Sequence, residues 1–368
     1  MQPGRPASPY SLRATLASPR AAAAAVRRVT AFLVGRRSSA PPVAVAWDVT
    51  YQCNCFCSFC ATHELHLRTG RGAPDQRIRI ARALVAGGVK AVALSGGEVL
   101  LVPDLRQLIE VLTRGGVSVY VNTNGSHLAR WAADLVQLGV RAITLSVDRL
   151  HPEHHEQMRE RPGLSAEIER GIESLLRSRR GSSRPLLRLR FLVTAANYVE
   201  IVPFVDRWHG KVEEIAFQPI QSLGPGDVHQ PGTKAVKHFF SSSDRAPLRA
   251  ALDELMRKYP AYDTFYYRHM TDFLFQPESV RNRFHCLVPA VAFKVLPNGD
   301  AVPCSDSSRV LGNVLNDGVQ RVWMSPYMEK LRTQSRLRTR TCLCWSQQIR
   351  LSDTIPSWAY VPISRVDA

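Results

Sequence analysis

Short apolar runs alternate with longer amphipathic stretches along the chain between residues 43 and 258. The stretches place apolar side chains at helical spacing, as at Ile168, Ile172 and Leu175, where Ser165 is the predicted N-terminal cap. The short runs predict strands at residues 43–49, 89–95, 117–122, 141–147, 187–194 and 212–218. Repeated strand–helix units form a parallel sheet. We therefore predict an α/β fold with a partial (β/α)6 TIM-like barrel, whose functional groups lie at the carboxyl ends of the strands.

The alternation ends after a helix predicted near residues 246–258. An aromatic and polar stretch follows, and then residues 293–303 predict two short strands around an Asn298-Gly299 turn. This pattern is typical of a small C-terminal α+β domain. The predicted organisation is an arm at 1–42, the barrel at 43–258, a bridge at 259–285, the small domain at 286–346 and a tail at 347–368.

The net charge is +17, and much of it lies in the arm. Seven arginines precede the first acidic residue, Asp48, in a segment that is otherwise rich in Pro, Ser and Ala. We therefore predict that the arm is partly disordered. Residues 20–36 are expected to form either a helix that lies on the protein or part of an organelle targeting peptide. No basic–aromatic module or zinc finger accompanies the charge, so nucleic-acid binding is not favoured. The positive net charge is compatible with an anionic substrate, an acidic partner or an anionic membrane surface.

The apolar runs fall well short of the roughly 18 residues that a membrane-spanning helix needs, and no secretory signal is recognisable. Eight cysteines in such a chain favour metal ligation over disulfides, because disulfides are rare where thiols are kept reduced. We therefore expect a cytoplasmic protein.

Four of the cysteines fall within the eight residues from Cys53 to Cys60, directly after the first predicted strand. Cys53, Cys57 and Cys60 have the spacing C-x3-C-x2-C, which lets one loop point three thiolates at an iron–sulfur cluster and leaves one iron without a protein ligand. A zinc site with Cys55 as fourth ligand is the alternative. Alternate residues on so short a loop do not readily close a tetrahedron, so zinc is disfavoured.

Further motifs stand at the ends of the next strands: Ser95-Gly96-Gly97-Glu98, Asn122-Thr123-Asn124-Gly125 and Ser146-Val147-Asp148. Together with the cysteine loop they resemble the radical S-adenosylmethionine (radical SAM) superfamily. The resemblance implies a 4Fe–4S cluster on the three cysteines, whose open iron binds S-adenosylmethionine and cleaves it to a 5′-deoxyadenosyl radical. Cys55 stands where the family has an aliphatic residue, so we interpret it as a bystander. The proline that usually follows the Glu is Val99 here.

The resemblance also implies which residues hold S-adenosylmethionine. His155-x3-Arg159 is similar to a family pattern whose arginine binds the methionine carboxylate, although Arg161 lies nearby. Gln218 and Gln221 are further candidates for a substrate or adenine contact. The implied set is Phe59 beside the adenine, with Gly96, Gly97, Glu98, Asn122, Ser146, Asp148 and Arg159 around the rest of the cofactor.

The remaining cysteines are Cys286, Cys304, Cys342 and Cys344. Four thiolates suit either a closed iron–sulfur cluster or a structural zinc. The pattern C-x(9–15)-G-x4-C around the predicted hairpin, followed by Gly312-Asn313, resembles the SPASM and twitch branch of the superfamily. That resemblance implies one auxiliary 4Fe–4S cluster on these four residues.

The function implied is hydrogen abstraction from a small-molecule natural-product or cofactor precursor, leading to oxidation, epimerisation or C–C bond formation, with electrons from a donor such as flavodoxin or ferredoxin. A peptide maturase acting on a ribosomal precursor is the alternative, although the 42 residues before the first strand are too few for the peptide-binding domain that such relatives often carry. A non-enzymatic iron–sulfur or zinc scaffold is the alternative of another class. Tyr266, Tyr267 and His269 are the candidates for a general acid or base.

Overall fold

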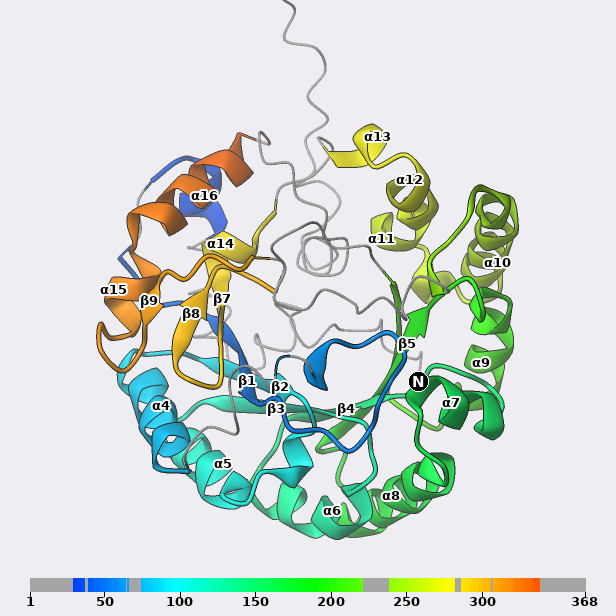
Figure 1. Ribbon diagram of the computed structural model, residues 1–368, viewed down its shortest axis with the longest axis horizontal. Coiled ribbons are helices and arrows are strands. Elements are labelled where there is room, and N and C mark those ends of the chain that lie inside the picture. Colours follow the sequence, from blue (N-terminus) through cyan, green and yellow to red (C-terminus); the bar gives the residue numbers. More distant parts are fainter. Residues whose placement is uncertain are drawn as a thin grey trace, which may run out of the picture.

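A computed structural model describes residues 29–36, 39–63, 65, 74–220, 238–281, 286–305 and 307–337. Six parallel strands form the barrel wall and follow one another in chain order across the sheet (Figure 1). They are β1 (Ala44–Thr50), β2 (Ala91–Gly96), β3 (Ser118–Thr123), β4 (Ala142–Ser146), β5 (Leu186–Val193) and β6 (Glu214–Pro219). The six predicted strands are therefore confirmed, with boundaries that differ by a few residues. No described helix is long and apolar enough to cross a membrane.

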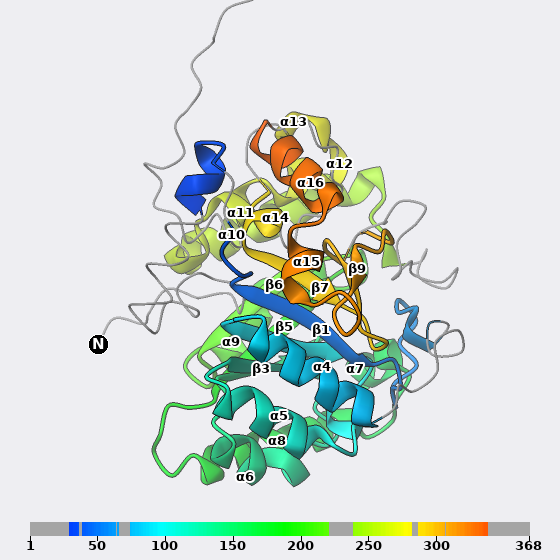
Figure 2. The ribbon, with the colours of Figure 1, turned by 90° about the vertical axis from the view of Figure 1, so that its left-hand side faces the viewer.

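Helices cover the outer face of this wall, as Figure 2 shows for α4 and α5. The covering helices are α4 (Pro74–Ala86), α5 (Leu105–Arg114), α6 (Leu128–Gln137), α7 (Pro152–Arg159), α8 (Leu164–Ser178), α9 (Ile201–Trp208) and α10 (Arg245–Lys258). In α5 the apolar stripe Leu105, Leu108, Ile109 and Leu112 is completely buried. Burial of each such side chain contributes roughly 1.5–3 kcal/mol, which fixes the helix to the sheet.

The strands have two different faces because side chains alternate along a strand. Outward-facing residues such as Val119 and Val121 belong to the main hydrophobic core under the helices. On the inward face, Tyr120 belongs to a small separate cluster of mostly alanine side chains. Buried charged residues, among them Asp48 and Arg188, also lie on this inward face, since their strand neighbours are in the outer core. The inside of the barrel is therefore more polar than its wall.

The predicted cap of α8 is wrong. The helix begins at Leu164, its cap position is Gly163, and Ser165 lies inside the first turn. The carboxylate of Glu156 accepts hydrogen bonds from the backbone N–H groups of Gly163 and Ser165 at 2.8 and 3.1 Å. A side chain from the preceding helix α7 thus satisfies the free donors at this helix start, which the local sequence of α8 does not reveal.

The C-terminal region adds strands to the same sheet. β7 (Ala292–Val295) pairs in parallel with β1, and β8 (Asp300–Val302) and β9 (Gly312–Asn313) continue from it in antiparallel pairs. The predicted hairpin around Asn298-Gly299 is confirmed, but it extends the barrel sheet and does not form one of its own. Three helices accompany it: α14 (Val288–Val291), α15 (Val319–Trp323) and α16 (Pro326–Arg336).

The predicted bridge is mostly helical where it is described. It contains α11 (Phe265–Arg268), α12 (Met270–Phe275) and α13 (Glu278–Arg281). The hydroxyl of Tyr266 donates to the carbonyl of Phe217 at 3.0 Å, and that of Tyr267 is 3.3 Å from the Phe217 N–H. Both rings belong to the outer core under β6. They therefore act as packing residues of the barrel wall.

Candidate active site

The cysteine loop begins where β1 ends and is held in place through its backbone. The N–H groups of Phe56 and Ser58 donate to the carbonyls of Arg159 and Met158 at 3.2 and 3.3 Å, at the end of α7. The Cys60 N–H donates to the Cys57 carbonyl at 3.1 Å, which closes a tight turn between these two cysteines. These bonds place the loop at the carboxyl-end rim of the barrel, where the sequence pattern predicted it.

The thiols of the loop differ in environment. Cys55 is buried with an exposed fraction of 2%, Cys53 and Cys57 are half-buried, and Cys60 is exposed. A hydrogen bond from Cys55, supported by the positive charge of Arg159, lowers the pKa of Cys57 to about 7. A thiol that ionises readily suits a metal ligand, since the thiolate is the ligating form. The donor set therefore fits an iron–sulfur cluster, although no three His, Cys, Asp or Glu side chains form a preformed metal cage in the described part of the chain.

Gly96 and Gly97 allow the end of β2 to lie directly against the start of the cysteine loop. The N–H of Gly97 donates to the Thr50 carbonyl at 2.7 Å, and that of Glu98 donates to the Gln52 carbonyl at 2.8 Å. A Cβ at Gly96 would lie 2.1 Å from the Thr50 oxygen, and one at Gly97 would lie 2.2 Å from the Gln52 oxygen. Because these contacts are with backbone, no side chain fits at either position.

Glu98 links the carboxyl end of β2 to the carboxyl end of β3 through hydrogen bonds. It is completely buried, and its carboxylate accepts hydrogen bonds from the Leu100 N–H at 2.9 Å, the Thr123 hydroxyl at 2.6 Å and the Asn124 N–H at 2.7 Å. Burial raises the pKa of this carboxyl, and the three donors oppose that effect. The carboxylate is thus fixed next to the cysteine loop by groups that favour its charged form.

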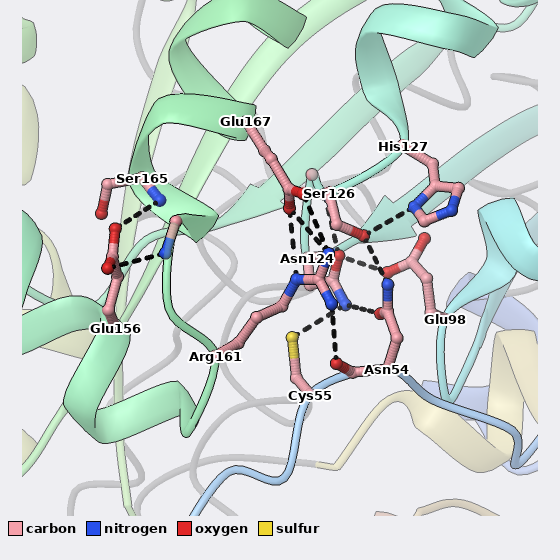
Figure 3. A network of polar contacts seen from close by, with 12 residues as sticks. Asn54, Cys55, Glu98, Asn124, Ser126, His127, Glu156, Arg161, Ser165 and Glu167 are labelled. Carbon is pink, nitrogen blue, oxygen red and sulfur yellow. Dashed lines mark hydrogen bonds and ion pairs between the residues drawn. The ribbon is translucent and has the colours of Figure 1, made fainter.

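A polar network holds the cysteine loop from the side of β3 and α8 (Figure 3). The amide of Asn124 donates to the Asn54 side-chain oxygen at 2.9 Å and to the Cys55 sulfur at 3.1 Å. Arg161 donates to the Asn54 carbonyl at 3.1 Å and pairs with Glu167 at 2.9 Å. The sequence analysis missed this role of Asn54, Asn124 and Arg161, since Asn54 is 70 positions from Asn124 and 107 from Arg161.

Arg159 and Asp148 form a second anchor next to the cysteines. The Arg159 guanidinium donates to an Asp148 carboxylate oxygen at 2.6 Å, lies 3.7 Å from the Cys57 sulfur and lies 5.2 Å from the Phe59 ring centre. The other Asp148 oxygen accepts from the Leu192 N–H at 2.9 Å. The Asp148 N–H donates to the imidazole of the buried His155, whose pKa burial lowers to about 4. The neutral His155 therefore serves this anchor as a hydrogen-bond acceptor.

The predicted Arg159 and the neighbouring Arg161 have different surroundings. Arg159 lies against Cys57 and Phe59, whereas Arg161 is held by Glu167 and the Asn54 carbonyl. We predict that Arg159→Lys weakens S-adenosylmethionine binding by about 10- to 100-fold, because losing a charge-assisted bidentate contact costs roughly 1.5–3 kcal/mol. Equilibrium binding to the reconstituted protein measures this. Arg161→Lys is the matched control and should change the dissociation constant less.

The remaining predicted residues lie on the inner face of the barrel, in the helical bridge, or outside the described residues. Asn122 and Ser146 are near the carboxyl ends of β3 and β4, and the side-chain oxygen of Asn122 is buried without a hydrogen-bond partner among described residues. Gln218 is half-buried on β6. Gln221 lies outside the described residues. His269 lies outside the barrel, 3.2 Å from Asp272.

The two described C-terminal cysteines, Cys286 and Cys304, are brought together. Both are buried and share one apolar cluster that also contains residues of α14. Cys342 and Cys344 lie outside the described residues. Two buried thiols in an apolar setting fit the predicted ligand set for an auxiliary cluster as far as it is described.

Two family models match these regions. The model of the Radical SAM superfamily matches residues 47–186, and the model of the iron–sulfur cluster-binding SPASM domain matches residues 286–345. The chain belongs to the radical SAM superfamily. Its C-terminal region is of the SPASM/twitch type, and its cofactors are S-adenosylmethionine and 4Fe–4S clusters. The predicted family, fold class and cofactors are confirmed.

Curated relatives of this radical SAM protein include GTP 3′,8-cyclases. The protein of Xanthomonas axonopodis pv. citri is 35% identical over 153 residues, covering 41% of this chain and 45% of the relative. That of Rhodopseudomonas palustris is 26% identical over 194 residues, covering 50% of this chain and 55% of the relative. The matches span about half the length of these relatives.

Solved structures with the same fold include two peptide complexes. Streptococcus suis SuiB bound to the precursor peptide SuiA has a TM-score of 0.56 at 16% identity, covering 86% of this chain and 72% of that one. anSMEcpe with bound AdoMet and the Cp18Cys peptide has a TM-score of 0.60 at 14% identity, covering 86% and 91%. At these identities the likeness concerns the fold alone.

Proposed function

We propose that this radical SAM enzyme acts on a small polar molecule bound inside the barrel. When bound, the cofactors supply a 5′-deoxyadenosyl radical, which removes a hydrogen atom from an unactivated C–H bond. The protein must bind the substrate, orient it and exclude water, because such a radical reacts with whatever it meets. The observation that carries the proposal is the polar layer on the inner face of the sheet.

This layer crosses the whole barrel wall. In the strand register Asp48 lies opposite Ser95, and Asn122, Thr144, Arg188 and Glu214 lie opposite one another in turn. Arg188 pairs with Glu214 at 2.9 Å, and Asp48 pairs with Lys294 of β7 at 2.7 Å. Burying four charges costs free energy even when they are paired, and apolar residues would pack as well for stability alone. The layer therefore favours a binding role.

Apart from the atoms that form these ion pairs, two polar atoms of the layer have no hydrogen-bond partner among the described residues. They are the Asn122 side-chain oxygen, an acceptor, and the Arg188 Nη1, a donor. An unsatisfied buried polar group costs about 1–3 kcal/mol, which a polar ligand inside the barrel would offset. A bound polar molecule with both a donor and an acceptor complements them.

The curated relatives support a small-molecule substrate, because their name, GTP 3′,8-cyclase, describes enzymes that act on a nucleotide. Two proteins of the same fold have bound peptides, which supports the competing class of substrate, a precursor peptide. This support is weaker, because it rests on a shared fold alone. The proposal therefore commits to a small polar molecule and leaves the peptide as the competing outcome. The proposal covers oxidation, epimerisation and C–C bond formation.

In the proposed site, Cys53, Cys57 and Cys60 hold the radical SAM cluster. Residues around them bind S-adenosylmethionine: Phe59, Gly96, Gly97, Glu98, Asn122, Ser146, Asp148 and Arg159. Arg159, held in place by Asp148, would orient its carboxylate, since the guanidinium already lies 3.7 Å from the Cys57 sulfur. Cys286, Cys304, Cys342 and Cys344 hold the auxiliary cluster. An external one-electron donor such as flavodoxin or ferredoxin supplies the electron.

Anaerobic reconstitution of the full chain tests the proposal. Reduced protein with S-adenosylmethionine should form 5′-deoxyadenosine, and a small-molecule extract of the host should accelerate this. In heavy water the 5′-deoxyadenosine formed with that extract should carry no solvent deuterium, because its new hydrogen comes from a substrate C–H bond. Acceleration by a peptide fraction alone would replace the small-molecule proposal with a peptide substrate. Absence of 5′-deoxyadenosine under all conditions would contradict the enzymatic function.

A further inference from the structure

The arm before β1 is docked on the C-terminal cluster region. The side chain of Trp323 donates to the Ala40 carbonyl at 3.2 Å, and that of Gln320 donates to the Ser39 carbonyl at 2.7 Å. The Val43 N–H donates to the Val291 carbonyl at 2.8 Å. Figure 1 shows the short helix of the arm, in dark blue, beside α16. Hydrogen bonds at three points thus fix the path of this segment over α14 and α15.

Two side chains of the arm enter the apolar cluster that contains Cys286 and Cys304. Val29 and Phe32 are buried, with exposed fractions of 8% and 7%, in one cluster with these cysteines and with residues of α14. The adjacent arm residues behave differently, since Leu33 and Val34 are 40% and 62% exposed. One face of this short helix is therefore turned to the apolar cluster that contains the cysteines, and the other is turned to solvent.

We infer that Val29 and Phe32 are the apolar cover of the auxiliary-cluster site, which keeps water from the cluster and holds its reduction potential low. The inference rests on the proposed auxiliary site. The reduction potential of an iron–sulfur cluster depends on its solvent exposure. A reduced cluster carries one more negative charge than an oxidised one, and an apolar cover disfavours that charge. The arm is thereby assigned a role in setting the electron affinity of the auxiliary site.

The experiment uses the full chain with Cys53, Cys57 and Cys60 replaced by alanine, so that only the auxiliary cluster remains, at about four iron atoms per chain. Phe32→Ala is made in this background, and Leu33→Ala is the matched control from the exposed face of the same helix. One readout is the rate at which a water-soluble iron chelator bleaches the cluster. The other is the midpoint potential, followed by electron paramagnetic resonance.

Phe32→Ala should raise the bleaching rate at least about tenfold, because loss of a buried aromatic ring makes opening of the cover easier. It should also shift the midpoint potential to more positive values. Leu33→Ala should change neither, and Phe32→Leu should restore both. If Phe32→Ala does not accumulate as folded protein, Val29→Ala provides the same comparison.

Equal bleaching rates and potentials for Phe32→Ala and Leu33→Ala would overturn the inference while leaving the auxiliary site in place. Two other results would instead contradict the auxiliary site itself, and with it the inference about Val29 and Phe32. One is a triple-alanine variant that contains no iron, and the other is iron that remains when Cys304→Ala is added to that variant. The two failures are therefore distinguishable.

Discussion

Cys57→Ala is expected to abolish 5′-deoxyadenosine formation and to lower the iron content by about four atoms per chain. Cys57 has the Arg159 guanidinium 3.7 Å from its sulfur, and its pKa is lowered to about 7, so it is suited to ligate as the thiolate. Without it, only two of the three predicted ligands remain, Cys53 and Cys60, and a cluster with an open iron needs three. Iron analysis and chromatography of the reaction mixture measure both effects.

Cys55→Ala is the matched control because it removes a thiol from the same loop. The Cys55 sulfur is buried, accepts a hydrogen bond from Asn124 at 3.1 Å and hydrogen-bonds Cys57, so the substitution removes these contacts and leaves the three predicted ligands in place. This variant should keep its iron and most of its activity. Equal iron loss in both variants, or cleavage that survives in Cys57→Ala, would contradict the assignment of the three ligands.

Gly97→Ala is expected to prevent the cysteine loop from docking on β2. The added Cβ would lie 2.2 Å from the Gln52 carbonyl oxygen and 2.6 Å from its carbon, and both atoms are backbone. The hydrogen bonds from Gly97 to Thr50 and from Glu98 to Gln52 cannot both survive that overlap. We expect loss of the radical SAM cluster and of S-adenosylmethionine binding, measured by iron analysis and equilibrium binding.

Gly116→Ala separates this steric effect from backbone strain. Gly116 has a φ of +75°, and a Cβ there would meet nothing within 4 Å. The substitution should therefore lower the free energy of unfolding by about 1–2 kcal/mol, the usual cost of a left-handed conformation in alanine, and leave cofactor binding unchanged. Normal cluster content in Gly97→Ala would show that the contact between β2 and the loop is not required.

Many features of this protein followed from local pattern. All six barrel strands were predicted within a few residues, because each carries a β-rich apolar run and is followed by an amphipathic helix. The cysteine spacing and the glycines at the end of β2 indicated the family before any geometry was known. What these glycines contact did not follow from the pattern: in the structure the group nearest to each is the backbone of Thr50 or Gln52.

Other features required the tertiary structure because they join distant residues. Glu156 caps α8 from α7, and the cysteine loop is held by Asn124 and Arg161. The Lys294–Asp48 pair links β7 to β1, although 246 positions separate the two residues. Each of these contacts depends on how the strands and helices are arranged in space, which no short stretch of sequence specifies.

The sequence by itself determined the repeated strand–helix order, the three-cysteine spacing and hence the resemblance to the radical SAM superfamily, because periodicity and ligand spacing are properties of neighbouring residues. Only the tertiary structure decided which of Arg159 and Arg161 lies by Cys57, which strand faces make the polar layer, and that Val29 and Phe32 of the arm pack with Cys286 and Cys304. These outcomes depend on the direction of each side chain in the folded sheet and on the pairing of β7 with β1.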